Sequence, residues 1–272
     1  MNQPTNYHDR IELSNSALNK FAISPKHYLH SKIYKPEPTA AMIFGSAFHC
    51  FVLEPEKFKT DYFVFNGSNR PNKEMTMAAK ENKAWKEKLY NDNPGKIQID
   101  ISDYQTLELM KCCILSHSGA KELLEGLTHR EEEIYWQDEV TGLKMRGKTD
   151  GRGNNYALDL KTCQTAEPRK FVSHAIDYGY HRQNAIYVDG YRANKININN
   201  FFFIAIESNM PHAVSVIRAT EDFEGLGRES YRALLSDFKY WEKMGSPDVG
   251  YEWKNPIDTI FDAELPKWIR NA

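Results

Sequence analysis

The sequence has few cysteines, and they form no recognisable metal-binding or disulfide pattern. It contains four, at positions 50, 112, 113 and 163, with no pair separated by two residues and no histidine at zinc-finger spacing. This excludes a zinc site of that kind. We expect the four thiols to be reduced, as in a cytoplasmic protein.

Long apolar runs and a strong net charge are also lacking. No apolar run approaches the roughly 20 residues that a helix needs to cross a bilayer, and the first ten residues lack a signal peptide's apolar region. We therefore expect a soluble cytoplasmic protein without a membrane partner. With 35 basic and 37 acidic residues the net charge is −2, which excludes a globally basic nucleic-acid-binding surface but allows a local basic groove.

The pattern of apolar residues predicts one α/β domain over residues 1–272. Residues 1–125 read as mostly helical, with amphipathic helices that include residues 75–92 and 102–125. Residues 126–245 read as the catalytic sheet core: a three-stranded antiparallel meander, a helix over 168–194, two further strands, and a helix over 221–244. This order predicts a mixed central sheet flanked by helices, followed by an irregular tail over residues 246–272.

A charged pair interrupts the third strand of the meander, "YALDLKT". Because side chains alternate along a strand, Asp159 and Lys161 share one face while Leu158 and Leu160 face the core. A short turn brings Asp150 near Asp159, and two such carboxylates repel each other unless a cation lies between them. Carboxylates suit Mg²⁺ or Mn²⁺, and the lysine could hold a water or stabilise charge on a phosphate. The pattern predicts a phosphodiester hydrolysis site, unless Asp159 and Lys161 are only a surface ion pair.

These residues match a known signature. Asp150, followed nine positions later by "DLK", resembles the signature of the PD-(D/E)xK nuclease superfamily, with Asp159 as the second acid and Lys161 as the lysine. The segment "GSAFH" resembles the G-x-x-x-H motif of the RecB-like branch. That resemblance implies that His49 is an additional metal ligand, the alternative being a buried core histidine.

A second helix motif extends the resemblance. The segment "QNAIY" resembles the Q-x-x-x-Y motif of the same branch, which places Gln183 and Tyr187 on one face of a helix. The motif implies that both residues position the DNA end or the attacking water near Lys161. The alternative is an ordinary pair of surface and core residues.

The order of all the motifs, from about residue 7 to about residue 245, is similar to the RecE-type exonucleases, the exodeoxyribonuclease VIII-like enzymes of phage and prophage recombination. The resemblance implies a restriction-endonuclease-like core and a Mg²⁺-dependent enzyme, with Mn²⁺ as a substitute, that digests linear double-stranded DNA from its 5′ ends. The 3′ overhangs are taken up by a RecT-like single-strand annealing protein. The family also forms toroidal oligomers, so we expect a ring of three or four subunits.

Three further residues are candidates on the first two strands of the meander. The resemblance implies that Glu131, in "REEEIYW", ligates a metal directly or through water. Arg146 and Lys148 fall on the same face as Asp150 if their strand is regular, and could contact phosphates. For all three the alternative is a solvated strand face. The expected first metal ion binds His49, Asp150 and Asp159, and a second could arrive with the phosphate.

Two other functions fit the same fold. A CRISPR-adaptation-type nuclease commonly binds an iron–sulfur cluster through four cysteines, but the spacing here differs, so we expect no cluster. A catalytically inactive DNA-binding module is the other alternative. The presence of Asp150, Asp159 and Lys161 argues against it.

Overall fold

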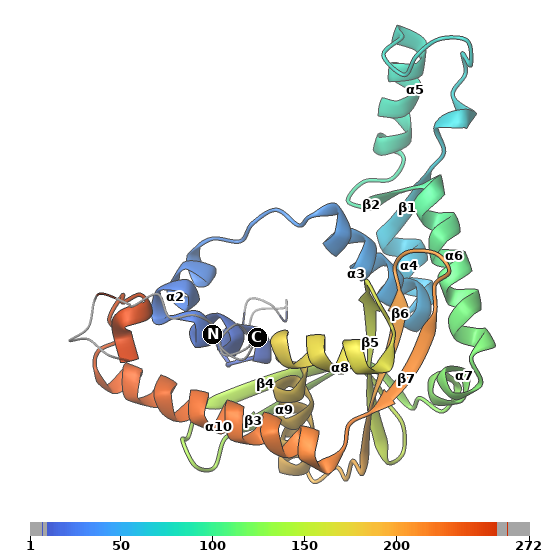
Figure 1. Cartoon of the computed structure of the whole chain (residues 1–272). Helices are drawn as coiled ribbons and strands as arrows, with labels where there is room; N and C mark the ends of the chain where they lie inside the picture. Colours follow the sequence, from blue (N-terminus) through green and yellow to red (C-terminus); the bar gives the residue numbers. More distant parts are fainter. Residues whose placement is uncertain (1–6, 8–9, 255–259, 261–272) are drawn as a thin grey trace, which may run out of the picture.

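The computed structural model describes residues 7, 10–254 and 260. Its helices are α1 (Asn15–Ile23), α2 (Pro25–Ile33), α3 (Ala40–Leu53), α4 (Pro55–Asp61), α5 (Lys80–Asn91), α6 (Ile101–Ser116), α7 (Ser118–Glu125), α8 (Pro168–Asp177), α9 (Tyr180–Ala193) and α10 (Glu221–Lys243), with short 3-10 turns η2 (Gly67–Asn69) and η3 (Tyr251–Lys254) (Figure 1). Its strands are β1 (Tyr62–Phe65), β2 (Ile97–Asp100), β3 (His129–Gln137), β4 (Lys144–Arg152), β5 (Tyr156–Cys163), β6 (Asn200–Glu207) and β7 (Val214–Arg218). Most of the predicted tail, residues 246–272, lies outside the described residues.

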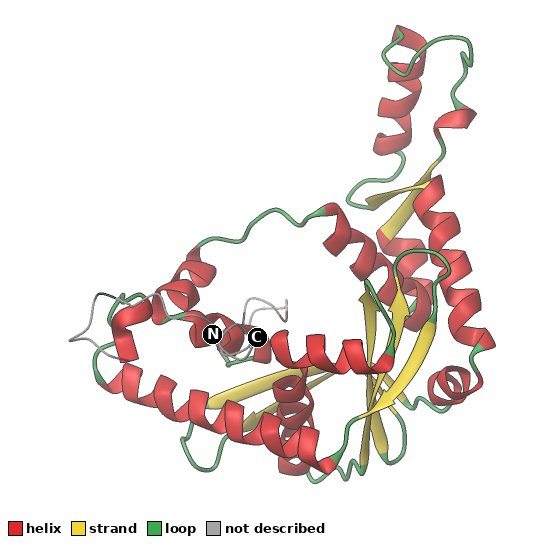
Figure 2. Ribbon diagram, viewed as in Figure 1, coloured by secondary structure: helices red, strands yellow, loops and turns green. Residues whose placement is uncertain are grey.

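Five strands form the central sheet in the order β3-β4-β5-β6-β7. Helices flank this sheet (Figure 2). The first three are an antiparallel meander, β6 runs parallel to β5, and β7 is antiparallel to β6. This confirms the predicted mixed sheet, with β6, whose central segment "FFFIAI" is wholly apolar, as an inner strand. Within the described part of the chain, no helix is both long and apolar enough to span a bilayer.

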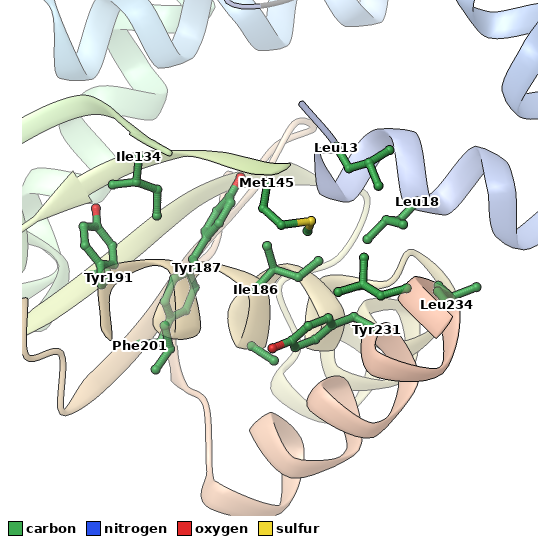
Figure 3. Close-up of a cluster of buried hydrophobic side chains, with 14 of the residues drawn as sticks. Leu13, Leu18, Ile134, Met145, Ile186, Tyr187, Tyr191, Phe201, Tyr231 and Leu234 are labelled. Atoms are coloured by element: carbon green, nitrogen blue, oxygen red, sulfur yellow. The ribbon is translucent and has the colours of Figure 1, made fainter. Parts of the chain in front are cut away.

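The two faces of the sheet are buried against different helices. One cluster of buried side chains joins the sheet to α1, α2, α8, α9 and α10, and the other joins it to α3, α4, α6 and α7. Alternate residues of β5 enter different clusters: Ala157 the first, Leu158 and Leu160 the second. Figure 3 shows part of the first cluster, where side chains of α1, β4, α9 and α10 point toward one another.

Two of the predicted helices are each divided in two, and local chemistry explains the breaks. The segment predicted as one helix over 168–194 breaks between α8 and α9 at Gly179, whose φ of 72° lies in the left-handed region that favours glycine. The segment predicted over 102–125 breaks between α6 and α7 at His117, whose extended backbone ends one helix and whose side chain accepts a hydrogen bond from the N–H of Ala120 in the next.

The hairpin of β4 and β5 opens on the side that carries the predicted acids. Only two residue pairs are in register, Gly151 with Leu158 and Arg152 with Ala157. Beyond them the N–H of Leu160 donates to the carboxylate of Asp150 at 2.6 Å. A side chain thus replaces a ladder hydrogen bond, and the separated strands leave room for a site between them.

A projecting arm lies between α4 and α6, and its helix α5 is the one predicted over residues 75–92, although the sequence did not indicate that the segment projects. It contains η2 and α5 and stands away from the rest of the molecule (Figure 1). The short strands β1 and β2 pair in parallel at its base. Within it, the buried amide of Asn82 accepts from the N–H of Asn72 at 3.0 Å and donates to the carbonyls of Asn72 and Thr76 at 2.8 and 3.0 Å. This one side chain fixes the loop that precedes α5.

Candidate active site

One cavity of about 590 Å³ lies between α1, α3, the open β4–β5 hairpin and α9. All nine predicted site residues line it: His49, Glu131, Arg146, Lys148, Asp150, Asp159, Lys161, Gln183 and Tyr187. They come from five elements, namely α3, β3, β4, β5 and α9. The structure therefore brings together every candidate site residue of the sequence analysis.

His49 and Asp150 form the first contact of the site. The Nδ1 atom of His49 lies 3.3 Å from Oδ2 of Asp150, the oxygen that also accepts from the N–H of Leu160. Burial alone would lower the pKa of His49, but the charge of Asp150 and their hydrogen bond raise it above its usual value. Burial would raise the pKa of Asp150, and the interactions with His49 hold it below its usual value instead. The pair therefore favours a charged carboxylate.

Glu131 completes a group of three possible metal ligands. Ligand atoms of His49, Glu131 and Asp150 lie within 4.8 Å of one another, and no other such group occurs in the described residues. Glu131 has a φ of 52° near the start of β3, where a left-handed backbone is uncommon for a residue other than glycine. One imidazole nitrogen and two carboxylates suit a hard divalent cation such as Mg²⁺ or Mn²⁺. These donors therefore fit the ion that the sequence predicts.

Asp159 lies in the same cavity as this group, and its predicted role as a metal ligand stays a prediction. It belongs to a neighbouring network, in which it pairs with the ammonium of Lys161 and accepts from Nε2 of Gln183 at 3.0 Å. It is 2% exposed, so β5 is buried on both faces rather than forming an edge. Burial and the charge of Asp150 raise the pKa of Asp159 to about 6.

The network holds Lys161 from several sides. Its ammonium donates to Oε1 of Gln183 at 3.1 Å, and Nε2 of Gln183 also donates to the hydroxyl of Tyr187 at 3.1 Å. Burial would lower the pKa of Lys161, but the charge of Asp159 raises it above its usual value. The lysine is therefore a fixed cation at one end of the cavity.

Sequence reasoning missed one residue of this network. The Lys161 ammonium lies 4.3 Å from the ring centroid of Tyr180, close enough for a cation–π interaction. Tyr180 precedes Gln183 by one helical turn on α9, so the i, i+3 spacing from the Q-x-x-x-Y motif could have indicated it.

The cavity wall on β4 carries two more cations. Arg146 is 5% exposed and lies over the ring of Tyr7, with 4.3 Å between its guanidinium carbon and the ring centroid. Its Nε and Nη1 have no hydrogen-bond acceptor among the described residues. The Lys148 ammonium lies 2.6 Å from Oε2 of Glu131. Buried N–H groups that lack an acceptor are costly, so Arg146 indicates an anionic ligand.

Comparison with known proteins agrees with this geometry. The model of a family described as "PDDEXK-like domain of unknown function (DUF3799)" matches residues 14–249. No curated protein sequence matches the chain significantly. The match and the five-stranded sheet confirm the predicted PD-(D/E)xK nuclease core.

Two solved structures are similar to different degrees. A protein from Eubacterium rectale, provisionally named an exonuclease, is 14% identical with a TM-score of 0.62, and the alignment covers 100% of this chain and 99% of that chain. At that identity the likeness concerns the fold alone. An alkaline exonuclease from Laribacter hongkongensis is 14% identical over 74% of this chain and 97% of its own, with a TM-score of 0.28, which is too low to add to the argument.

Proposed function

Because the chain belongs to the family of PDDEXK-like domains, we propose that it is a Mg²⁺-dependent exonuclease that digests linear double-stranded DNA from its 5′ ends. One observation carries this proposal. The donor group of His49, Glu131 and Asp150 shares a cavity with the fixed ammonium of Lys161. A cation site beside a positioned lysine is what hydrolysis of a phosphodiester requires.

The two parts of the site have different tasks. A divalent cation on His49, Glu131 and Asp150 would neutralise charge on the phosphate and activate water. Lys161, held by Asp159 and Gln183, orients the attacking water and stabilises the charge that develops on the phosphate oxygens. Because these residues hold Lys161 before substrate binds, little reorganisation is needed during the reaction.

The cations on β4 provide the contacts to DNA. Two guanidinium nitrogens of Arg146, Nε and Nη1, have no acceptor among the described residues, and the oxygens of a phosphate can accept from them. Lys148 adds a second positive charge to the same wall. A local basic wall of this kind holds DNA even though the whole chain has a net charge of −2.

The resemblance to RecE-type exonucleases supports a role in recombination. The product is then a 3′ overhang for a RecT-like annealing protein, in the cytoplasm of a bacterial host. The same resemblance supports a ring of three or four subunits around DNA.

Digestion of end-labelled DNA tests the proposal. Linear duplex labelled at the 5′ or the 3′ end is incubated with Mg²⁺ or EDTA, beside a closed circular control. We expect early release of the 5′ label, Mg²⁺ dependence and an intact circle. Early release of the 3′ label would contradict the polarity, and cleavage of the circle would indicate an endonuclease. If no divalent ion supports digestion, the result would instead favour the alternative that the protein is a catalytically inactive DNA-binding module.

A matched pair of variants tests whether the nuclease activity depends on this cavity. Asp150→Asn should abolish digestion. Glu139→Gln removes the same charge from an exposed residue between β3 and β4, outside the cavity, and should leave digestion unchanged.

A further inference from the structure

Lys148 makes a contact that phosphate binding alone does not explain. Its ammonium lies 2.6 Å from Oε2 of Glu131, and the two side chains are 29% and 17% exposed. Glu131 is also one of the three possible metal ligands, together with His49 and Asp150. The lysine therefore binds one of the oxygens that would be needed around a cation.

The backbone of β3 is strained to produce this arrangement. The left-handed conformation of Glu131, with its φ of 52°, is unfavourable for a residue other than glycine and persists only where the surroundings impose it. Glu131 and Asp150 interrupt the β3–β4 register between the pairs Arg130–Gly151 and Glu132–Thr149. Two carboxylates are thus held close together, and a nearby cation offsets their repulsion.

The other cations of the cavity do not occupy this position. Lys161 pairs with Asp159, and Lys57 lies 3.0 Å from Glu54, a residue outside the donor group. Arg146 lies over the ring of Tyr7. Of the cavity lysines and arginine described, Lys148 is the one with an ion pair to a member of the donor group.

We propose that Lys148 is an internal counter-cation that competes with the divalent metal for Glu131 and leaves Glu131 when a DNA phosphate binds, so that DNA binding strengthens metal binding. A lysine suits this exchange because its ammonium is a compact charge on a flexible stem. The phosphate provides a new acceptor for the ammonium, and Glu131 becomes available as a full ligand. The inference rests on the proposed function, since it requires DNA in the cavity.

The exchange must be reciprocal. If bound DNA increases the affinity for metal, bound metal increases the affinity for DNA by the same factor, and couplings of this kind are typically about 5–150-fold. Without DNA, the ammonium of Lys148 offsets the negative charge of the carboxylates of Glu131 and Asp150. A divalent metal ion then binds only weakly.

Calorimetric titration of Ca²⁺ tests the inference, with and without a short duplex and with DNA integrity checked on a gel. For the wild type we expect the duplex to lower the Kd for Ca²⁺ at least about fivefold. Lys148→Gln should bind Ca²⁺ more tightly than the wild type without DNA, and the duplex should change its Kd less than twofold. Lys148→Arg keeps the charge and should retain a duplex effect, and it serves as the second variant if Lys148→Gln does not fold.

Lys57→Gln is the matched control, because it removes the same charge from the same cavity. An equal gain in Ca²⁺ affinity in Lys57→Gln would show a general electrostatic effect and overturn the inference. So would an unchanged or weaker affinity in Lys148→Gln, or a wild-type Kd that does not respond to DNA. Digestion of linear duplex with Mg²⁺ is measured separately: its absence contradicts the proposed function, whereas digestion with an unresponsive Kd contradicts the role of Lys148 alone.

Discussion

Protonation of two individual residues, His49 in the donor group and Asp159 beside it, opposes metal binding. The charge of Asp150 raises the pKa of His49 against the effect of burial, and burial together with Asp150 raises that of Asp159 to about 6. Below these pKa values protons compete with the cation, and above them the site is free to bind it. We therefore expect metal affinity to rise with pH, most steeply from about pH 6 upward, and protons to be released on binding.

Calorimetry in two buffers of different protonation enthalpy measures this release at pH 6.5. His49→Ala should release fewer protons than the wild type. Equal heats of Mn²⁺ binding in the two buffers would contradict the expectation.

Lys161 offers a second prediction at this scale. Lys161→Ala removes the fixed cation but none of the three metal ligands, so metal binding should persist. Turnover should fall about 100-fold or more, as expected for the loss of one electrostatic stabiliser. Initial rates on linear duplex measure this, with the exposed Lys144→Ala on β4 as the control. Near-normal turnover in Lys161→Ala would show that the ion pair of Asp159 and Lys161 has only a structural role.

The sequence motifs located the site residues but not all their contacts. All nine candidates line one cavity, which shows that residue type and strand face were enough to find them. The contacts depend on backbone conformation, which the motifs do not record. Regular alternation along β3 does not predict the positive φ of Glu131, a residue that lies in one group with His49 and Asp150.

At the scale of elements, the contact between α9 and α10 depends on a glycine. A Cβ at position 227 would lie 2.0 Å from the carbonyl oxygen of His181, whereas one at position 225, on the same helix, would meet nothing within 4 Å. Gly227→Ala must separate the helices and should destabilise the protein by about 1–3 kcal/mol. Gly225→Ala should instead stabilise it by up to about 1 kcal/mol, because alanine is the better helix former.

Urea unfolding of both variants measures the difference. Similar transition midpoints for Gly227→Ala and Gly225→Ala would mean that the two helices adjust without cost.

Strands and helices with a long periodic pattern of apolar residues were predicted well from the sequence, and short ones were not. The sheet strands β3 to β7 and the helix α10 follow from alternation and helical spacing. Strands β1 and β2 have four residues each, too few for a reliable pattern, and they pair only with each other. Gly179 ends a helix here, but a single glycine inside an apolar pattern also occurs in continuous helices.

For the whole molecule, the charge balance motivates the prediction of a ring. A chain with a net charge of −2 has no broad basic surface to retain DNA, and affinity of that electrostatic kind falls steeply with salt. Enclosure of the duplex by three or four subunits would retain it topologically.

Light scattering measures the assembly directly, and the length digested per binding event measures retention. We expect a closed trimer or tetramer. A monomer that still digests kilobases in one binding event would contradict the ring.

The arm at residues 66–96 is a segment that could be replaced by a short linker. Because β1 and β2 are parallel, the chain leaves at Phe65 and returns at Ile97, which pairs with Tyr62, so the two ends are about 10 Å apart along the strand direction. A linker of about five glycine and serine residues spans such a gap. We expect a chain with this exchange to keep the melting temperature of the sheet core, as measured by circular dichroism; a large drop would show that the core depends on the arm. If the core is retained, fluorescent proteins or affinity tags can be inserted there without interrupting the catalytic sheet.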